Sequence, residues 1–146
     1  MESPHRGTTS GNRLWGTAVG PGTAYDLIVV DAFSLKIPVT AQNLDAANRA
    51  FAVALQQAGA TLEGTGTKTT MAGLPALLFR TTSTTGGNRH QSRIVIAFSG
   101  TTEYFVNCQY TPAKTAEVEQ ACHQVIGSFR VGKASATQTQ PGALAG

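Results

Sequence analysis

The sequence predicts an α+β domain in which helices cover both faces of an antiparallel sheet. Strand-like segments follow one another between residues 60 and 110, separated by short turns rich in glycine. Segments with helical periodicity flank them, at 41–58 and after Thr111. The central run Ile94–Phe98 is continuously apolar, which is typical of a strand that is covered on both faces.

The 146-residue chain suits one domain with a tail at each end. Residues 1–23 are mostly small or polar, and residues 132–146 are small, polar and aperiodic. Neither segment has enough apolar surface to offset the entropy lost on ordering, so we expect both to be disordered. The folded domain is therefore predicted to span residues 24–131.

The predicted strands form two groups. An extended segment at 24–39 supplies one or two short strands and stops at Pro38. After the first helix comes a Thr-rich strand that contains Gly64 and Gly66. We expect it to lie at a sheet edge or to carry a bulge, because glycine weakens a strand interior. Further strands complete a four-strand antiparallel meander, at 76–85, 89–98 and 103–110.

The first predicted helix spans residues 41–58. Thr40 is its expected N-cap, and Gly59 is placed to adopt the left-handed conformation that often ends a helix. Its apolar stripe consists of Leu44, Ala47, Phe51, Ala54, Leu55 and Ala58. The second helix is expected to begin after Thr111, its N-cap, with Pro112 at the first position. Its buried stripe consists of Val118, Cys122, Val125, Ile126 and Phe129.

The cysteines Cys108 and Cys122 are predicted to form a disulfide. Alternation along the last strand puts Cys108 on the face toward the last helix, and puts Phe105, Asn107 and Gln109 on the other face. Both sulfurs then point into one layer. A disulfide closing a loop of this length stabilises a fold by about 3 kcal/mol, and it favours an oxidising compartment. The alternative is a pair of buried free thiols.

Metal binding is a weaker alternative for the cysteines, with His90 and His123 as further ligands. Adjacent residues on a helix point about 100° apart, so Cys122 and His123 converge poorly on one ion. Their spacing matches no standard zinc site. We expect His5, His90 and His123 to be solvated or capping residues, and we expect neither a metal nor a cofactor.

The sequence carries no catalytic signature. It lacks a Gly-x-Ser-x-Gly elbow, a phosphate loop and paired carboxylates, and no base is identifiable for Ser128. Arg80, Arg89 and Arg93 lie around one hairpin, where charges more often block sheet association than bind nucleic acid. The net charge of +3 is dispersed, so a nucleic-acid partner is not favoured.

No targeting or membrane-spanning segment is recognisable. The first 20 residues lack an apolar core, and no cysteine precedes Cys108 that could carry a lipid anchor. No run approaches the ~20 apolar residues that a transmembrane helix needs. We expect either a cytoplasmic protein or an exported one whose export signal is not present in this chain.

The closing residues resemble a known family. The strand E-Y-F-V-N-C-Q-Y-T at 103–111, the helix after it and the ending V-I-G-S-F-R-V at 125–131 resemble actinobacterial lipoproteins of the PsbP-like group, including the LpqN type. The F-S-x-x-x-P segment at 33–38 and the Gly-Leu-Pro-Ala turn at 73–76 look similar as well. The chain departs from that pattern in lacking the Gly-Trp that often follows the proline and in lacking a lipid-anchor cysteine.

This resemblance covers about residues 30–131 and implies a PsbP-like α/β/α sandwich that is exported and is not an enzyme. With the cysteine pair, it leads to our hypothesis of a non-enzymatic extracytoplasmic binding or accessory domain of the bacterial cell envelope. Its partner would be a protein or an envelope ligand. The alternative is a cytoplasmic small-molecule binding domain or enzyme, which requires a pocket lined by convergent polar groups between helix 41–58 and the sheet.

Overall fold

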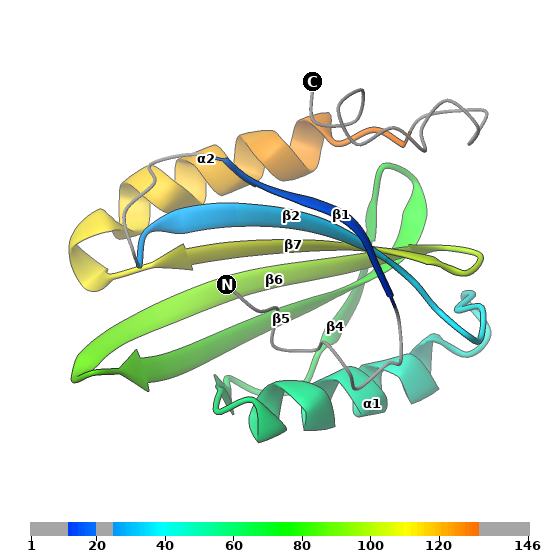
Figure 1. Cartoon of the computed structure of the whole chain (residues 1–146), viewed down its shortest axis with the longest axis horizontal. Helices are drawn as coiled ribbons and strands as arrows, with labels where there is room; N and C mark the ends of the chain where they lie inside the picture. The colour runs from blue at the N-terminus through cyan, green and yellow to red at the C-terminus, as the bar shows by residue number, and fades with distance from the viewer. Residues whose placement is uncertain (1–11, 20–24, 132–146) are drawn as a thin grey trace.

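The computed structural model describes residues 12–19 and 25–131 (Figure 1). The strands are β1 (Asn12–Val19), β2 (Leu27–Ser34), β3 (Thr61–Leu62), β4 (Thr67–Met71), β5 (Leu74–Thr85), β6 (Asn88–Ser99) and β7 (Thr102–Tyr110). The helices are α1 (Leu44–Gln57), the short 3₁₀ helix η1 (Pro112–Lys114) and α2 (Thr115–Ser128). None of the described helices is long and apolar enough to cross a bilayer.

The described strands form one antiparallel sheet of seven strands. Its order is β1-β2-β7-β6-β5-β3, and β4 also pairs with β5. Helix α1 covers one face of the sheet and α2 covers the other (Figure 1). The predicted α+β fold, with helices on both faces, is therefore confirmed.

The sheet separates two apolar cores, one under each helix. The core under α1 contains Phe33, Leu44, Phe51, Leu55, Leu77, Phe79, Ile94, Ile96, Phe98 and Phe105. The core under α2 contains Ile28, Val30, Met71, Ala76, Val95, Ala97, Val106, Cys108, Tyr110, Val118 and Cys122. Successive residues of β6 alternate between these cores, because side chains alternate across a strand. This alternation explains the continuous apolar run in β6.

The N-terminal prediction is wrong for residues 12–19. They form β1, which pairs antiparallel with β2 from Asn12–Ser34 to Val19–Ile28. This segment mixes polar, small and apolar residues and shows little apolar periodicity of its own. Its strand depends on backbone hydrogen bonds to β2, which cannot be identified locally. The remaining residues of the two predicted tails, 1–11, 20–23 and 132–146, lie outside the described residues.

Helix α1 begins at Leu44 rather than at residue 41, so Thr40 is not its N-cap. Instead, Thr40 takes part in a turn before the helix. The Thr40 backbone N–H donates to Asn43 Oδ1 at 2.7 Å, and Thr40 Oγ1 accepts from the Gln42 N–H at 3.2 Å. The C-terminal prediction is confirmed, since Gly59 has a φ of +99°.

The interrupted edge strand is confirmed as β3 and β4, which both pair with β5. The intervening loop lies against α1, where Asn48 Nδ2 donates to the Gly66 carbonyl at 2.9 Å. A Cβ at Gly66 would lie 2.5 Å from Asn48 Oδ1 and 2.6 Å from a Phe79 ring carbon. Only glycine fits at this point without displacing the α1 contact.

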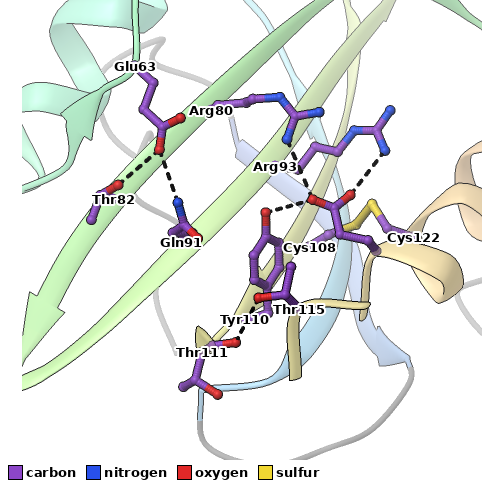
Figure 2. A network of polar contacts seen from close by, with 11 residues as sticks. Glu63, Arg80, Thr82, Gln91, Arg93, Cys108, Tyr110, Thr111, Thr115 and Cys122 are labelled. Atoms are coloured by element: carbon purple, nitrogen blue, oxygen red, sulfur yellow. Dashed lines mark hydrogen bonds and ion pairs between the residues drawn. A yellow bond between two sulfur atoms is a disulfide. The ribbon is translucent and has the colours of Figure 1, made fainter. Parts of the chain in front are cut away.

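A disulfide joins α2 to the sheet. Cys108 of β7 and Cys122 of α2 are bonded, with their Cα atoms 5.9 Å apart, and both residues are fully buried (Figure 2). The predicted pairing is confirmed. Neither sulfur is therefore available as a thiolate ligand for a metal ion.

The carboxylate of Glu119 gives α2 a second attachment to the sheet. It accepts a hydrogen bond from Tyr110 Oη at 2.7 Å and pairs with guanidinium nitrogens of Arg80 and Arg93, each at 3.6 Å (Figure 2). Burial and the hydrogen bond to Glu119 raise the pKa of Tyr110 to about 12, so the phenol stays protonated as a donor. Arg80 and Arg93 thus bind α2, and they do not form an unpaired basic edge.

Removing the disulfide should lower the stability of the fold, because the unfolded chain without the bond has more conformational freedom. The double variant Cys108→Ala/Cys122→Ala is expected to lose about 3 kcal/mol of unfolding free energy, measured by denaturant titration. The wild-type protein with reductant is the matched control, since it keeps both side chains and loses only the bond. Equal midpoints for oxidised and reduced wild-type protein would contradict a stabilising disulfide.

Candidate ligand-binding pocket

The face of the sheet under α1 changes from apolar to polar along β5, β6 and β7, one row earlier in β7 than in β5 and β6. In β5 the change follows Phe79, in β6 it precedes Ile94, and in β7 it follows Phe105. The strand register aligns these positions in rows across the sheet. The apolar rows contain Leu77, Ile96 and Phe105, then Phe79 and Ile94, and the polar positions are Asn107, Thr81, Ser92, Gln109, Ser83 and His90.

Helix α1 covers the apolar rows and ends where the polar rows begin. The Ala60 backbone N–H donates to the Leu55 carbonyl at 3.0 Å, which turns the chain sharply after the helix. The chain then enters β3, where Thr61 pairs with Thr82 of β5. The last turn of α1 and residues 58–60 therefore form a wall above the polar end of the sheet.

A cavity of about 360 Å³ lies beside this wall. It falls within the size range of about 300–1,000 Å³ that is usual for small-molecule sites. The sheet supplies its polar lining, and Leu55, Ala58, Ala60 and Ile94 supply apolar surface. The polar lining consists of Thr81, Ser83, Thr84, Thr85, His90, Ser92, Asn107 and Gln109. We call this cavity the α1-end pocket.

Two buried polar atoms in the lining of the α1-end pocket have no hydrogen-bond partner among the residues that the structure describes. They are Nδ1 of His90 and Oδ1 of Asn107. The two residues are only 6% and 5% exposed. A buried polar group without a partner costs about 1–3 kcal/mol. Both atoms are inaccessible in this structure, so a ligand in the cavity could offset that cost only after the side chains turn toward it.

Tyr25 closes another side of the pocket. Its ring stacks on the His90 imidazole, with centroids 5.5 Å apart and planes inclined by 27°. The neighbouring Asp26 anchors this segment, since its Oδ1 accepts hydrogen bonds from the Thr111 N–H at 2.8 Å and from Thr111 Oγ1 at 2.9 Å. Thr111 therefore binds the start of β2, and its side chain does not cap the following helix as predicted.

The chemistry of the described lining favours hydrogen bonding. Apart from His90 and Tyr25, the lining residues within 25–131 include no titratable side chain. Hydroxyl and carboxamide groups both donate and accept hydrogen bonds. The described part of the lining places no carboxylate, lysine or thiol next to His90. Among the described residues, no group of three or more His, Cys, Asp or Glu side chains could hold a metal ion.

Of the three histidines considered in the sequence, one lies in the pocket. His90 was expected to be solvated or capping, and that expectation is wrong, because the residue is buried on the sheet. His123 is exposed on α2, as expected. His5 lies outside the described residues. Ser128 Oγ donates to the Gln124 carbonyl of its own helix at 2.7 Å.

The pocket residues on the neighbouring strands were not identified from the sequence. Alternation did place Asn107 and Gln109 on the face away from α2, which is correct. The turn at Gly86-Gly87 has positive φ at both residues, as a two-residue hairpin requires. That turn fixes the register that places Ser92 beside Thr81. The alternation along β7 and the glycine turn between β5 and β6 together could have predicted which polar positions align across the sheet.

Comparison with known proteins shows the fold. No protein-family profile and no curated protein sequence matches the chain. The chain is similar to the solved structure of PA94 from Pseudomonas aeruginosa, a protein of unknown function described as a putative regulator. The TM-score is 0.57 at 16% identity, over 86% of this chain and 85% of that one. At this identity the likeness establishes a shared α+β fold.

Weaker likenesses extend to other bacteria. LpqN of Mycobacterium tuberculosis, described as involved in cell envelope biogenesis, has a TM-score of 0.45 and 16% identity over 78% of this chain and 68% of that one. A Bacteroides thetaiotaomicron protein has a TM-score of 0.46 and 13% identity over 82% of this chain and 43% of that one. These are relations of fold, and membership of a PsbP-like family stays a prediction.

Replacing the unpartnered amide should stabilise the protein. Asn107→Leu keeps the side-chain size, removes Oδ1 and places apolar atoms beside Ile94 and Phe105. We expect the free energy of unfolding to rise by about 1 kcal/mol or more, measured by denaturant titration. A loss of stability would show that the Asn107 amide has a structural partner, and it would contradict this description of the pocket.

Proposed function

We propose that this protein is a non-enzymatic extracytoplasmic domain that binds a small ligand in the α1-end pocket. The observation that carries the proposal is a pair of buried atoms in the lining of one cavity, His90 Nδ1 and Asn107 Oδ1, which have no partner within residues 12–19 and 25–131. Buried polar groups in folded proteins are nearly always hydrogen-bonded, so exceptions that share a cavity favour a binding site. The proposed role is that of an accessory protein of the cell envelope.

Binding is favoured over catalysis by what surrounds His90. A general base needs a proton to take and usually a second group that orients it. Here the ring of His90 stacks on Tyr25, and the other described polar groups of the lining are hydroxyls and carboxamides. These groups hold and orient a ligand well and transfer protons poorly near neutral pH.

The disulfide supports the extracytoplasmic part of the proposal. Such bonds persist in oxidising compartments and are rare in reducing cytosol. The Cys108–Cys122 bond is fully buried between β7 and α2, so it has a structural position. The resemblance of the closing residues to envelope lipoproteins points to the same compartment.

A second candidate is the cytoplasmic small-molecule binding domain or enzyme. The α1-end pocket fits its requirement for convergent polar groups near helix α1. Most of the interface between α1 and the sheet is a filled apolar core, however, and the pocket occupies only the end of the helix. The disulfide argues against the cytoplasmic location.

Fragment binding tests the proposal without knowledge of the natural ligand. A mixture of small neutral and charged fragments is added to the ¹⁵N-labelled, disulfide-intact chain, and amide shifts are followed by NMR. We expect bound fragments to shift residues of the polar lining, and we expect Asn107→Leu to remove these shifts. The matched control is Thr82→Val, since Thr82 lies on the opposite face and donates to Glu63 at 3.0 Å. Fragments that bind only elsewhere would overturn the proposal.

A further inference from the structure

We propose that the α1-end pocket takes an uncharged ring that carries several hydroxyl groups, of the size of a small sugar or a cyclic polyol. The inference rests on the proposed binding function and adds the chemical class of the ligand. It comes from the charge, the hydrogen-bonding groups and the shape of the lining.

Apart from His90, the lining residues that the structure describes offer no counter-charge to an ionic ligand. An ion removed from water without a partner of opposite charge loses several kcal/mol of hydration. Arg80, Arg89 and Arg93 are each adjacent in sequence to a lining residue, and alternation along the strands places all three on the opposite face, where Glu119 binds Arg80 and Arg93. Their neighbours Thr81 and Ser92 face the cavity instead. Because side chains alternate along β5 and β6, the arginines lie on the face under α2, whereas Thr81 and Ser92 lie on the face under α1.

The hydrogen-bonding groups of the pocket match hydroxyl groups. Asn107 Oδ1 accepts only, so a ligand that reaches it after the side chain turns toward the cavity must donate to it. The buried side chains of Thr81, Ser92 and Gln109 can each donate and accept. A ligand hydroxyl also does both, and several hydroxyls around a ring can satisfy neighbouring groups in different directions. A ligand with only acceptors would leave Asn107 Oδ1 without a partner.

The pocket has a polar side and an apolar side. The sheet supplies the hydrogen-bonding groups, while Leu55 and Ala58 at the end of α1 and the Tyr25 ring supply apolar surface. A ring with hydroxyl groups at its edge and C–H groups on its faces has the same division. Such a ring can direct its hydroxyls to the sheet and rest its C–H groups on the helix end and Tyr25.

Matched probes of different charge test this inference. The neutral probes are D-glucose, D-galactose, D-mannose and myo-inositol, and the charged counterparts are D-glucuronate and D-glucosamine at a pH where its amine is protonated. Binding to the disulfide-intact chain is measured by NMR titration of the amides of the lining. We expect at least one neutral probe to bind with a Kd at least about tenfold lower than either charged analogue.

Variants on one strand provide the control. Thr81→Val removes a hydroxyl of the lining, and Thr82→Val removes one on the opposite face, at nearly constant size. We expect Thr81→Val to weaken binding of the neutral probe about tenfold, with Thr82→Val close to wild type.

Equal or tighter binding of a charged analogue would overturn the inference. If fragments bind in the pocket and no neutral probe does, the ligand class is wrong and the binding function stands; if neither binds, both fail.

Discussion

The antiparallel register of β5, β6 and β7 determines what each face of the sheet can do. A shift of one residue in either hairpin would exchange the two faces of a strand, because side chains alternate with a period of two. In the observed register, Arg80 and Arg93 meet Glu119 of α2, and Cys108 meets Cys122. The same register gathers the neutral polar side chains on the other face, beyond the end of α1.

The two faces differ in how completely they are covered. On one face α2 is held by a covalent bond, a shared carboxylate and an apolar core, so it has little freedom to move away from the sheet. On the other face α1 stops at Gln57 and leaves the polar rows beside a cavity. Because α2 holds one face of the sheet rigidly, the hydrogen-bonding groups on the other face keep fixed positions. Less conformational entropy of the site is then lost when a ligand binds.

Much of the fold could be predicted from the sequence because its signals are local. The stripe of α1, the glycine turns of the meander and the alternation around Cys108 each act within a few residues. Strand β1 could not be predicted, since it depends on pairing with β2. The α1-end pocket could not be predicted for a similar reason: it depends on where α1 ends above the sheet and on Tyr25, which Asp26 and Thr111 hold beside His90.

The central claim is that His90 and Asn107 keep hydrogen-bonding capacity that the protein itself does not use. A high-resolution crystal structure of the whole disulfide-intact chain tests it most directly. We predict an open cavity in which ordered solvent or a bound molecule lies within about 2.7–3.2 Å of both His90 Nδ1 and Asn107 Oδ1. A cavity filled by protein side chains, with both atoms bonded to the protein, would contradict the account.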